Sequence, residues 1–152
     1  KPLLQGESSR LYRRLVREEQ LAISVYGGLE DKIDPYLFMI EVKPRPGADL
    51  GRIEKIIDEE LSKIVKEGLT ETEYEKALNI IRSGFYSGLQ TNSGKANMLG
   101  AMEILYGSYD RLFTLVDSYL AIKRQDIPAI AGKYFNELNK TAGYLIPEGG
   151  QK

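Results

Sequence analysis

The residues that limit the chemistry most are two that the sequence lacks, because it contains no histidine and no cysteine. Catalytic zinc sites take their ligands from His, Cys and carboxylates. Ser–His–Asp and Cys–His arrangements both need an imidazole base. The chain alone therefore cannot provide these sites, although carboxylate pairs, lysine bases and Mg²⁺ sites stay open on composition. We expect no catalytic residue and no metal ligand in it.

Basic side chains form one conspicuous stripe near the N-terminus, with the spacing of a single helix face. Its members are Arg10, Arg13, Arg14 and Arg17. Such a face can hold phosphates or an acidic partner. However, Glu18 and Glu19 follow directly, and no basic arm or interleaved aromatic residues accompany it. A solvated or domain-interface face is the preferred interpretation, an acidic partner is the alternative, and nucleic acid is not expected.

Carboxylates gather in two groups that resemble acid/base or metal clusters. They are Glu54, Asp58, Glu59 and Glu60, and then Glu71, Glu73 and Glu75. Both groups alternate with lysines on the polar faces of predicted amphipathic helices, which favours solvated helix faces.

Two glycine motifs resemble catalytic loops and fail on spacing. In the first, Gly88 and the Gly94-Lys95-Ala96 run are one residue too far apart for a phosphate-binding loop, Ala96 replaces the required hydroxyl, and a helical pattern precedes them. A helix–helix corner is the simpler prediction. The second, Gly84 to Gly88, has the wrong spacing for a nucleophile elbow and lacks a base.

Length and charge indicate an ordinary globular domain. The 152 residues fit one domain, and a net charge of −1 with a pI of about 5.7 does not indicate nucleic acid or an anionic membrane as a partner. The apolar runs are much shorter than the roughly 20 residues that span a bilayer. The first residues are not typical of a signal peptide, but a leader could have been removed or the sequence could be a fragment. A soluble protein is expected, and its compartment, the bacterial cytoplasm or periplasm, and its natural terminus are left open.

The positioning elements begin with a helix and a hairpin. A helix is predicted over residues 8–20, with Ser8 or Ser9 as its cap. Alternating apolar residues predict strands over 21–30 and 36–43, joined as an antiparallel hairpin with one buried face. Gly27-Gly28 indicates a bulge or a close backbone approach.

Helices are expected to follow, with one strand at the end. Asp49 caps a helix that ends at Gly68, and Thr70 with Glu73 forms a capping box for the next helix, which continues to about residue 89. Shorter helices are predicted around 99–105, 112–120 and 127–138, and a final strand over 141–147. The order indicates an α+β domain, an antiparallel sheet backed by several helices. Three strands are few for so many helices.

Seven stretches of the chain carry a resemblance through their residues and their order: 8–25, 43–47, 68–77, 94–100, 107–109, 125–135 and 141–147. Together they resemble the pitrilysin/insulinase family of zinc peptidases, the relatives of mitochondrial processing peptidase, and the similarity covers nearly the whole sequence. The resemblance implies an antiparallel sheet backed by helices. Relatives place a strand and part of a helix before Ser8, so residues 1–152 are expected to be a single domain that lacks them and is a fragment of a longer chain.

The same resemblance implies what the chain does not do. In that family, four such domains enclose a peptide-degrading chamber, and one carries the zinc motif His-x-x-Glu-His. A second element of the family is an Arg with a Tyr seven residues later, which hold the substrate carbonyl. The best alignment places these two roles on Val16 and Ile23, and a shift by one gives Arg17 and Ser24. Val16 and Ile23 are aliphatic, so neither can donate a hydrogen bond to an oxyanion, and the shifted pair still lacks a tyrosine.

The resemblance and the missing ligands together predict a non-catalytic domain of a zinc metallopeptidase. Its partners would be a catalytic zinc domain, in cis or in trans, which carries the zinc, and a peptide substrate. It is expected to be inactive as an isolated chain, and membranes are not expected partners. A degenerate, purely scaffolding half and a stand-alone interaction domain that uses the arginine stripe are the alternatives.

Overall fold

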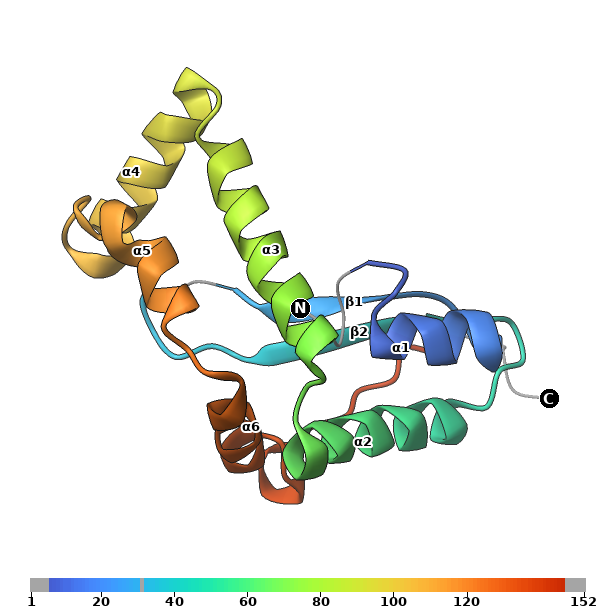
Figure 1. Cartoon of the computed structure of the whole chain (residues 1–152). Coiled ribbons are helices and arrows are strands. Elements are labelled where there is room, and N and C mark those ends of the chain that lie inside the picture. The colour runs from blue at the N-terminus through green and yellow to red at the C-terminus, as the bar shows by residue number, and fades with distance from the viewer. Residues whose placement is uncertain (1–5, 31, 147–152) are drawn as a thin grey trace.

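A computed structural model describes residues 6–30 and 32–146, and its elements are shown in Figure 1. In chain order they are α1 (Arg10–Tyr12), the π-helical η1 (Arg13–Glu18), β1 (Ala22–Leu29), β2 (Phe38–Pro44), α2 (Leu50–Glu67), α3 (Glu71–Gly88), α4 (Asn92–Tyr106), α5 (Arg111–Leu120), the 3₁₀ turn η2 (Arg124–Asp126), α6 (Ile127–Tyr134) and the 3₁₀ turn η3 (Glu137–Asn139). The α+β class is confirmed, with two antiparallel strands where three had been expected.

The hairpin is irregular at its start and tightly packed at Gly27. The register shifts between Ala22 and Ser24, and this bulge buries Ala22 while Ile23 stays 48% exposed. Gly27 has φ +138°, and a Cβ there would lie 2.0 Å from the carbonyl oxygen of Met39 on β2. The predicted close backbone approach is therefore confirmed at Gly27, and the bulge lies five residues earlier.

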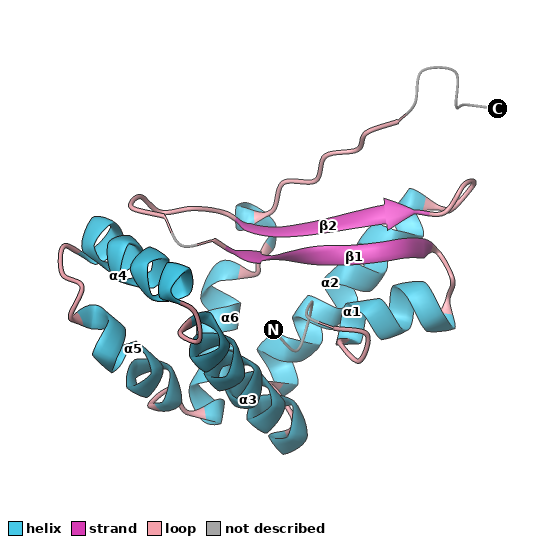
Figure 2. Cartoon of the chain, turned by 90° about the horizontal axis from the view of Figure 1, so that it is seen from above, coloured by secondary structure: helices cyan, strands magenta, loops and turns pink. Residues whose placement is uncertain are grey.

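The main core lies between the inner face of the hairpin and the helices that pack on it. It draws on α1, η1, β1, α2 and α6, and its most deeply buried residues include Leu11, Leu15, Ala22 and Ile56. On β2, Ile40 and Val42 face this core, whereas the alternate residues Glu41 and Lys43 are exposed, as predicted. Figure 2 shows the hairpin as one layer and the helices as the other.

The predicted caps of α2 and α3 are confirmed, whereas the predicted cap of the first helix is not. The Asp49 carboxylate accepts the backbone N–H of Arg52 at 3.1 Å, and Gly68 ends α2 with φ +75°. Thr70 and Glu73 form the capping box of α3. The serine cap of the first helix is wrong: Ser9 occupies the N-cap position, but its buried hydroxyl makes no hydrogen bond within the described residues.

Helices α3, α4 and α5 form an arm that stands away from the hairpin (Figure 1). The α3 stripe is only half-buried, because α3 packs chiefly on α4 and α5, whereas Tyr74 at its start packs against the main core. Thr91 caps α4 by accepting the N–H of Gly94 at 3.0 Å. A Cβ at Gly94 would lie 1.9 Å from the carbonyl oxygen of Gly88, so the glycine motif is the predicted helix–helix corner.

The C-terminal part corrects two predictions. Helix α6 ends at Tyr134, four residues earlier than expected. Residues 141–146 form no strand, because they have no ladder partner among the described residues, and Leu145 is 100% exposed; Pro147, the last residue of the predicted strand, lies outside the described residues. Within 6–30 and 32–146, no helix combines the length and hydropathy of a membrane span.

Candidate interface groove

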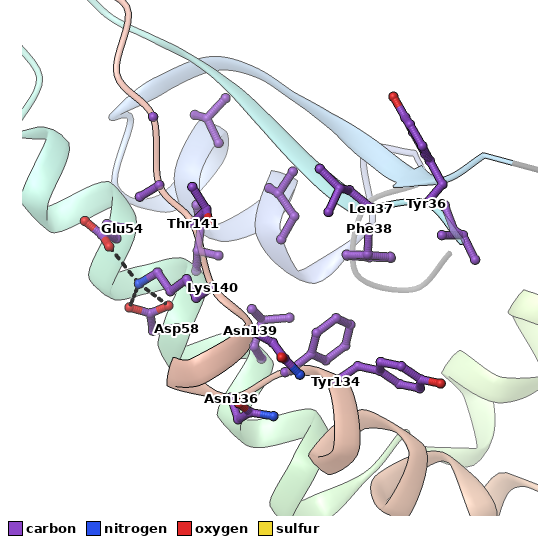
Figure 3. Close-up of a pocket in the computed structure, with 18 of the residues that line it drawn as sticks. Tyr36, Leu37, Phe38, Glu54, Asp58, Tyr134, Asn136, Asn139, Lys140 and Thr141 are labelled. Atoms are coloured by element: carbon purple, nitrogen blue, oxygen red, sulfur yellow. Dashed lines mark hydrogen bonds and ion pairs between the residues drawn. The ribbon is translucent and has the colours of Figure 1, made fainter. Parts of the chain in front are cut away.

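A groove of about 1200 Å³ lies between β2, α2, α6 and the extended segment 141–146. Helix α2 contributes the floor through Leu50, Ile53, Ile57 and Leu61. The side chains of Phe38, Ile40 and Val42 on β2 form one wall, and residues 136–144 form the opposite wall. Figure 3 shows these elements around the recess, which is mostly apolar in its lining.

The amphipathic pattern of α2 explains the floor. Its apolar residues recur at helical spacing, so that one edge of the stripe is buried in the core that α2 shares with α1 and η1, and the other edge points into the groove. Ile56 lies on the buried edge, Ile53 is buried but also reaches the groove, and Ile57 and Leu61 are only partly covered. At the end of the groove near β2, the rings of Phe38 and Phe135 pack with centroids 5.1 Å apart.

A polar cluster holds residues 141–146 against α2 at the outer edge of the groove (Figure 3). The Lys140 ammonium donates to both oxygens of Asp58 at 2.9 and 2.7 Å and lies 2.7 Å from an oxygen of Glu54. The Tyr144 hydroxyl also donates to Glu54. These bonds raise the pKa of Lys140, chiefly through Asp58, and lower the pKa of the Glu54 carboxyl, chiefly through Lys140.

Two extended backbones border the groove without pairing across it. Strand β2 pairs with β1 on one edge only, and its other edge forms no ladder with any described residue. Segment 141–146 runs in the same direction as β2 in both Figure 1 and Figure 2. Unpaired strand edges of this kind are where proteins add further strands.

The arginine stripe is occupied by carboxylates of the chain itself. Arg10 pairs with Glu73, Arg14 with Glu59 and Glu60, Arg17 with Glu7, and Arg13 with Glu18. The Arg10 pair joins α1 to α3, and the Arg14 pairs join η1 to α2. These pairs use the charge that an external acidic partner would need.

Most carboxylates of the two acidic groups predicted to be solvated helix faces instead pair with basic side chains of other segments. Glu60 is only 4% exposed and accepts from Arg14 and Lys63 at 3.0 and 2.8 Å. Its burial was missed because the arginine that neutralises it lies 46 residues away. No set of three His, Cys, Asp or Glu in the described ranges could hold a metal ion. The residues present therefore do not fit a catalytic zinc.

The two positions that align with the family's substrate-binding pair lie outside the groove. Val16 is half-buried in η1 and packs against the core, whereas Ile23 is exposed at the bulge of β1. The two polar residues of the shifted alignment also lie outside the groove: Arg17 pairs with Glu7, and Ser24 is in strand β1 of the hairpin. The groove itself was missed by sequence reasoning, and its one visible signal was the shortage of strands.

Comparison with known proteins identifies the group to which this architecture belongs. The family profile described as "Peptidase M16 inactive domain" matches residues 2–81. An uncharacterized zinc protease of Mycobacterium leprae is 26% identical over 132 residues, which cover 87% of this chain and 29% of the relative. The zinc protease PqqE of Helicobacter pylori is 24% identical over 143 residues, or 94% of this chain and 32% of the relative. The chain spans about a third of the length of the curated relatives it matches.

A solved structure shows the same fold. The inactive peptidase domain of a zinc protease from Bordetella parapertussis superimposes with a TM-score of 0.85 at 25% identity, covering 97% of this chain and 80% of that one. The family match spans more than half of the sequence, and the hairpin, the α2 stripe and the absent metal ligands agree with it. The chain belongs to the inactive-domain family of the M16 zinc peptidases.

Proposed function

We propose that the chain is a non-catalytic domain of a zinc metallopeptidase, which packs against the zinc-bearing domain and helps to enclose the peptide substrate. The observation that carries the proposal is the match of residues 2–81 to an inactive peptidase domain. The exposed apolar groove supports it, because apolar recesses of this size on a soluble domain are characteristic of interaction surfaces. The zinc belongs to the partner domain in this proposal.

The chain's contribution would be positional. The aliphatic residues of α2 on the floor of the groove offer apolar burial to another polypeptide. The unpaired edge of β2 offers it backbone hydrogen bonds. A wall of this kind excludes water and orients an extended substrate near a metal held by another domain. It requires no acid, base or nucleophile from the chain.

Co-expression tests this proposal directly. The chain is expressed with the polypeptide that carries His-x-x-Glu-His from the same genomic locus, and the pair is analysed by size-exclusion chromatography and by cleavage of a quenched fluorescent peptide. We expect co-elution and at least about tenfold faster cleavage by the pair than by the zinc polypeptide alone.

Each other outcome has a definite meaning. Metal-dependent cleavage by the pure chain would refute a non-catalytic role. A stable complex without faster cleavage would refute substrate enclosure and support the purely scaffolding alternative. Separate elution at micromolar concentrations would refute packing against the zinc domain.

A further inference from the structure

The arm of α3, α4 and α5 joins the body of the domain, which is the hairpin with α1, α2 and α6, through two neighbouring connections. The chain leaves α2 through residues 68–70 and returns from α5 through residues 121–123 (Figure 1). The two connections are tied together, because the Tyr74 hydroxyl at the start of α3 donates to the carbonyl oxygen of Ile122 at 2.6 Å. The helices of the arm pack chiefly on one another. A few connecting residues between two packed bodies are the layout of a hinge.

Two arginines hold the outgoing connection in its conformation. Arg10 of α1 donates to the carbonyl oxygen of Gly68 at 3.2 Å, and Arg124 of η2 donates to that of Leu69 at 2.9 Å. Gly68 has φ +75°, and glycine moves between positive and negative φ at little steric cost. The conformation of the connection is therefore fixed by side chains from outside it more than by its own backbone preference.

Arg10 also reaches across the connection to the arm. Its Nε and Nη2 each lie 2.6 Å from an oxygen of Glu73 on α3, and Lys76 of α3 donates to the Ser8 hydroxyl. Arg10 and Ser8 belong to the body, whereas Glu73 and Lys76 lie on the arm. Hydrogen bonds weaken steeply as their distance and angle change, so a rotation of the arm would break these contacts. They form a latch that holds the arm away from the hairpin.

An apolar recess separates the arm from the loop of the hairpin. It has a volume of about 410 Å³ and lies between Leu105 of α4 and residues 32–36 of the loop. Ile33 is 71% exposed and Tyr36 47%, and Leu105 is half-buried. Figure 2 shows α4 beside this loop. Closure of the recess would remove apolar surface on both of its sides from water, and this gain opposes the latch.

We propose that the arm is a hinged lid, which rotates as a rigid body about residues 68–70 and 121–123 and closes on the loop of the hairpin. The contacts of the latch favour the open arm, and apolar burial at the recess favours the closed arm. Two opposing contributions of this kind give two populated states of one chain. The inference goes beyond the proposed function and does not depend on it.

Double electron–electron resonance tests the inference, because a chain without cysteine can be spin-labelled at introduced cysteines alone. Asn97→Cys on α4 and Glu41→Cys on β2, both at exposed positions, report the distance between arm and hairpin. Asn97→Cys with Asp117→Cys on α5 reports a distance within the arm. We expect two distances from the first pair, the major one from the open arm, and one distance from the second pair. A single distance from the first pair would overturn the inference.

Loss of the latch should shift the two populations. We expect Arg10→Gln to raise the closed-to-open ratio of the first pair at least about fivefold. Arg13→Gln is the matched control and should leave the ratio unchanged, because Arg13 pairs with Glu18 on the body. Equal ratios in the two variants would refute the latch. A broadened distance within the arm in Arg10→Gln would mean that the arm unfolds, which contradicts rotation as a rigid body.

The recess supplies a second pair of variants, which decides if Arg10→Gln fails to fold. Leu105→Asn makes one side of the recess polar, whereas Ile104→Asn changes the preceding residue, which is 71% exposed and is not among the residues that line the recess. We expect Leu105→Asn to lower the closed-to-open ratio at least about fivefold and Ile104→Asn to preserve it. An unchanged ratio in Leu105→Asn would show that the arm does not close on the loop, and the inference would then be wrong.

Discussion

Arg10 on α1 and Glu73 on α3, which are 63 residues apart in the sequence, form an ion pair with two hydrogen bonds. Nε and Nη2 of Arg10 each lie 2.6 Å from a different oxygen of the Glu73 carboxylate. One of these oxygens also accepts the backbone N–H of Thr70 at 2.9 Å. The carboxylate therefore closes the capping box of α3 and anchors α1 on it, and Arg10 above all lowers the pKa of Glu73 from 4.5 to about 2.

The first prediction concerns Glu73→Gln and its pH dependence. Because the folded pKa lies below the unfolded one, the stabilisation is complete above pH 4.5 and is lost as the pH falls toward 2. At pH 7 we expect the variant to lose about 2 kcal/mol of unfolding free energy, and the difference from wild type to shrink as the pH is lowered to 2.5. Urea unfolding at pH 7, 4 and 2.5 measures it. The exposed Glu75→Gln serves as control, and a pH-independent difference would contradict the argument.

A pair of neighbouring glycines gives the second prediction. Gly27 and Gly28 both have positive φ, +138° and +146°, but only at Gly27 would a Cβ meet the Met39 carbonyl oxygen. We expect Gly27→Ala to destabilise by about 3 kcal/mol or more, and Gly28→Ala by about 1–2 kcal/mol from backbone strain alone. Thermal and urea unfolding compare the two, and equal losses would show that the close approach is unimportant.

The third prediction uses two glycines of α4. At Gly94 a Cβ would lie 1.9 Å from the Gly88 carbonyl oxygen, whereas at Gly100 no atom lies within 4 Å of it. Gly100→Ala should stabilise the protein by about 0.5–1 kcal/mol, because alanine loses less backbone entropy in a helix. Gly94→Ala should destabilise it by opening the corner between α3 and α4. Circular dichroism melting curves decide, and stabilisation by both variants would refute the tight corner.

Lys140→Ala is the fourth test, because Lys140 joins 141–146 to Asp58 and Glu54 of α2. Without this lysine the two carboxylates repel each other and the segment loses its anchor. We expect limited proteolysis within 141–146 to become about fivefold faster, with little change in the melting temperature of the whole chain. Lys133→Ala is the matched control on α6. Unchanged cleavage in Lys140→Ala would show that the anchor lies elsewhere.

Metal dependence provides the fifth prediction. With no histidine or cysteine in the sequence, zinc has no ligand set of the usual kind in this chain. Adding 100 µM zinc or excess EDTA to the isolated chain should change its melting temperature by less than about 1 °C, because a ligand stabilises only when it binds the native state. A larger, saturable shift in differential scanning fluorimetry would contradict this prediction.

Local signals in the sequence predicted much of the fold. Asp49, Thr70 and Glu73 cap their helices through contacts only three residues away, which is why their roles could be read from the sequence. The same holds for Gly68, whose positive φ ends α2. Gly27 was also recognised, since adjacent glycines inside a strand pattern indicate a close approach of backbones.

Long-range partners are what the sequence did not reveal. The arginines of the stripe pair with carboxylates on α2 and α3, and their spacing indicates a face without showing what covers it. The strand expected at 141–147 has the right composition, but strand formation requires a neighbour, and none lies beside 141–146 in the described chain. The groove likewise lies between segment 141–146 and elements far from it in the sequence, so it could be found only in three dimensions.

The separation of the arm from the hairpin has a consequence for how the protein unfolds. The main core cluster takes its buried members from residues 11–69 and Ala131, whereas Met102, Leu112 and Val116 are buried apart from it, within the arm. Tyr74 and Arg124 bond to backbone carbonyls at the base of the arm. We therefore expect the arm to open sub-globally at a lower free-energy cost than the whole domain, while the hairpin and α2 stay intact.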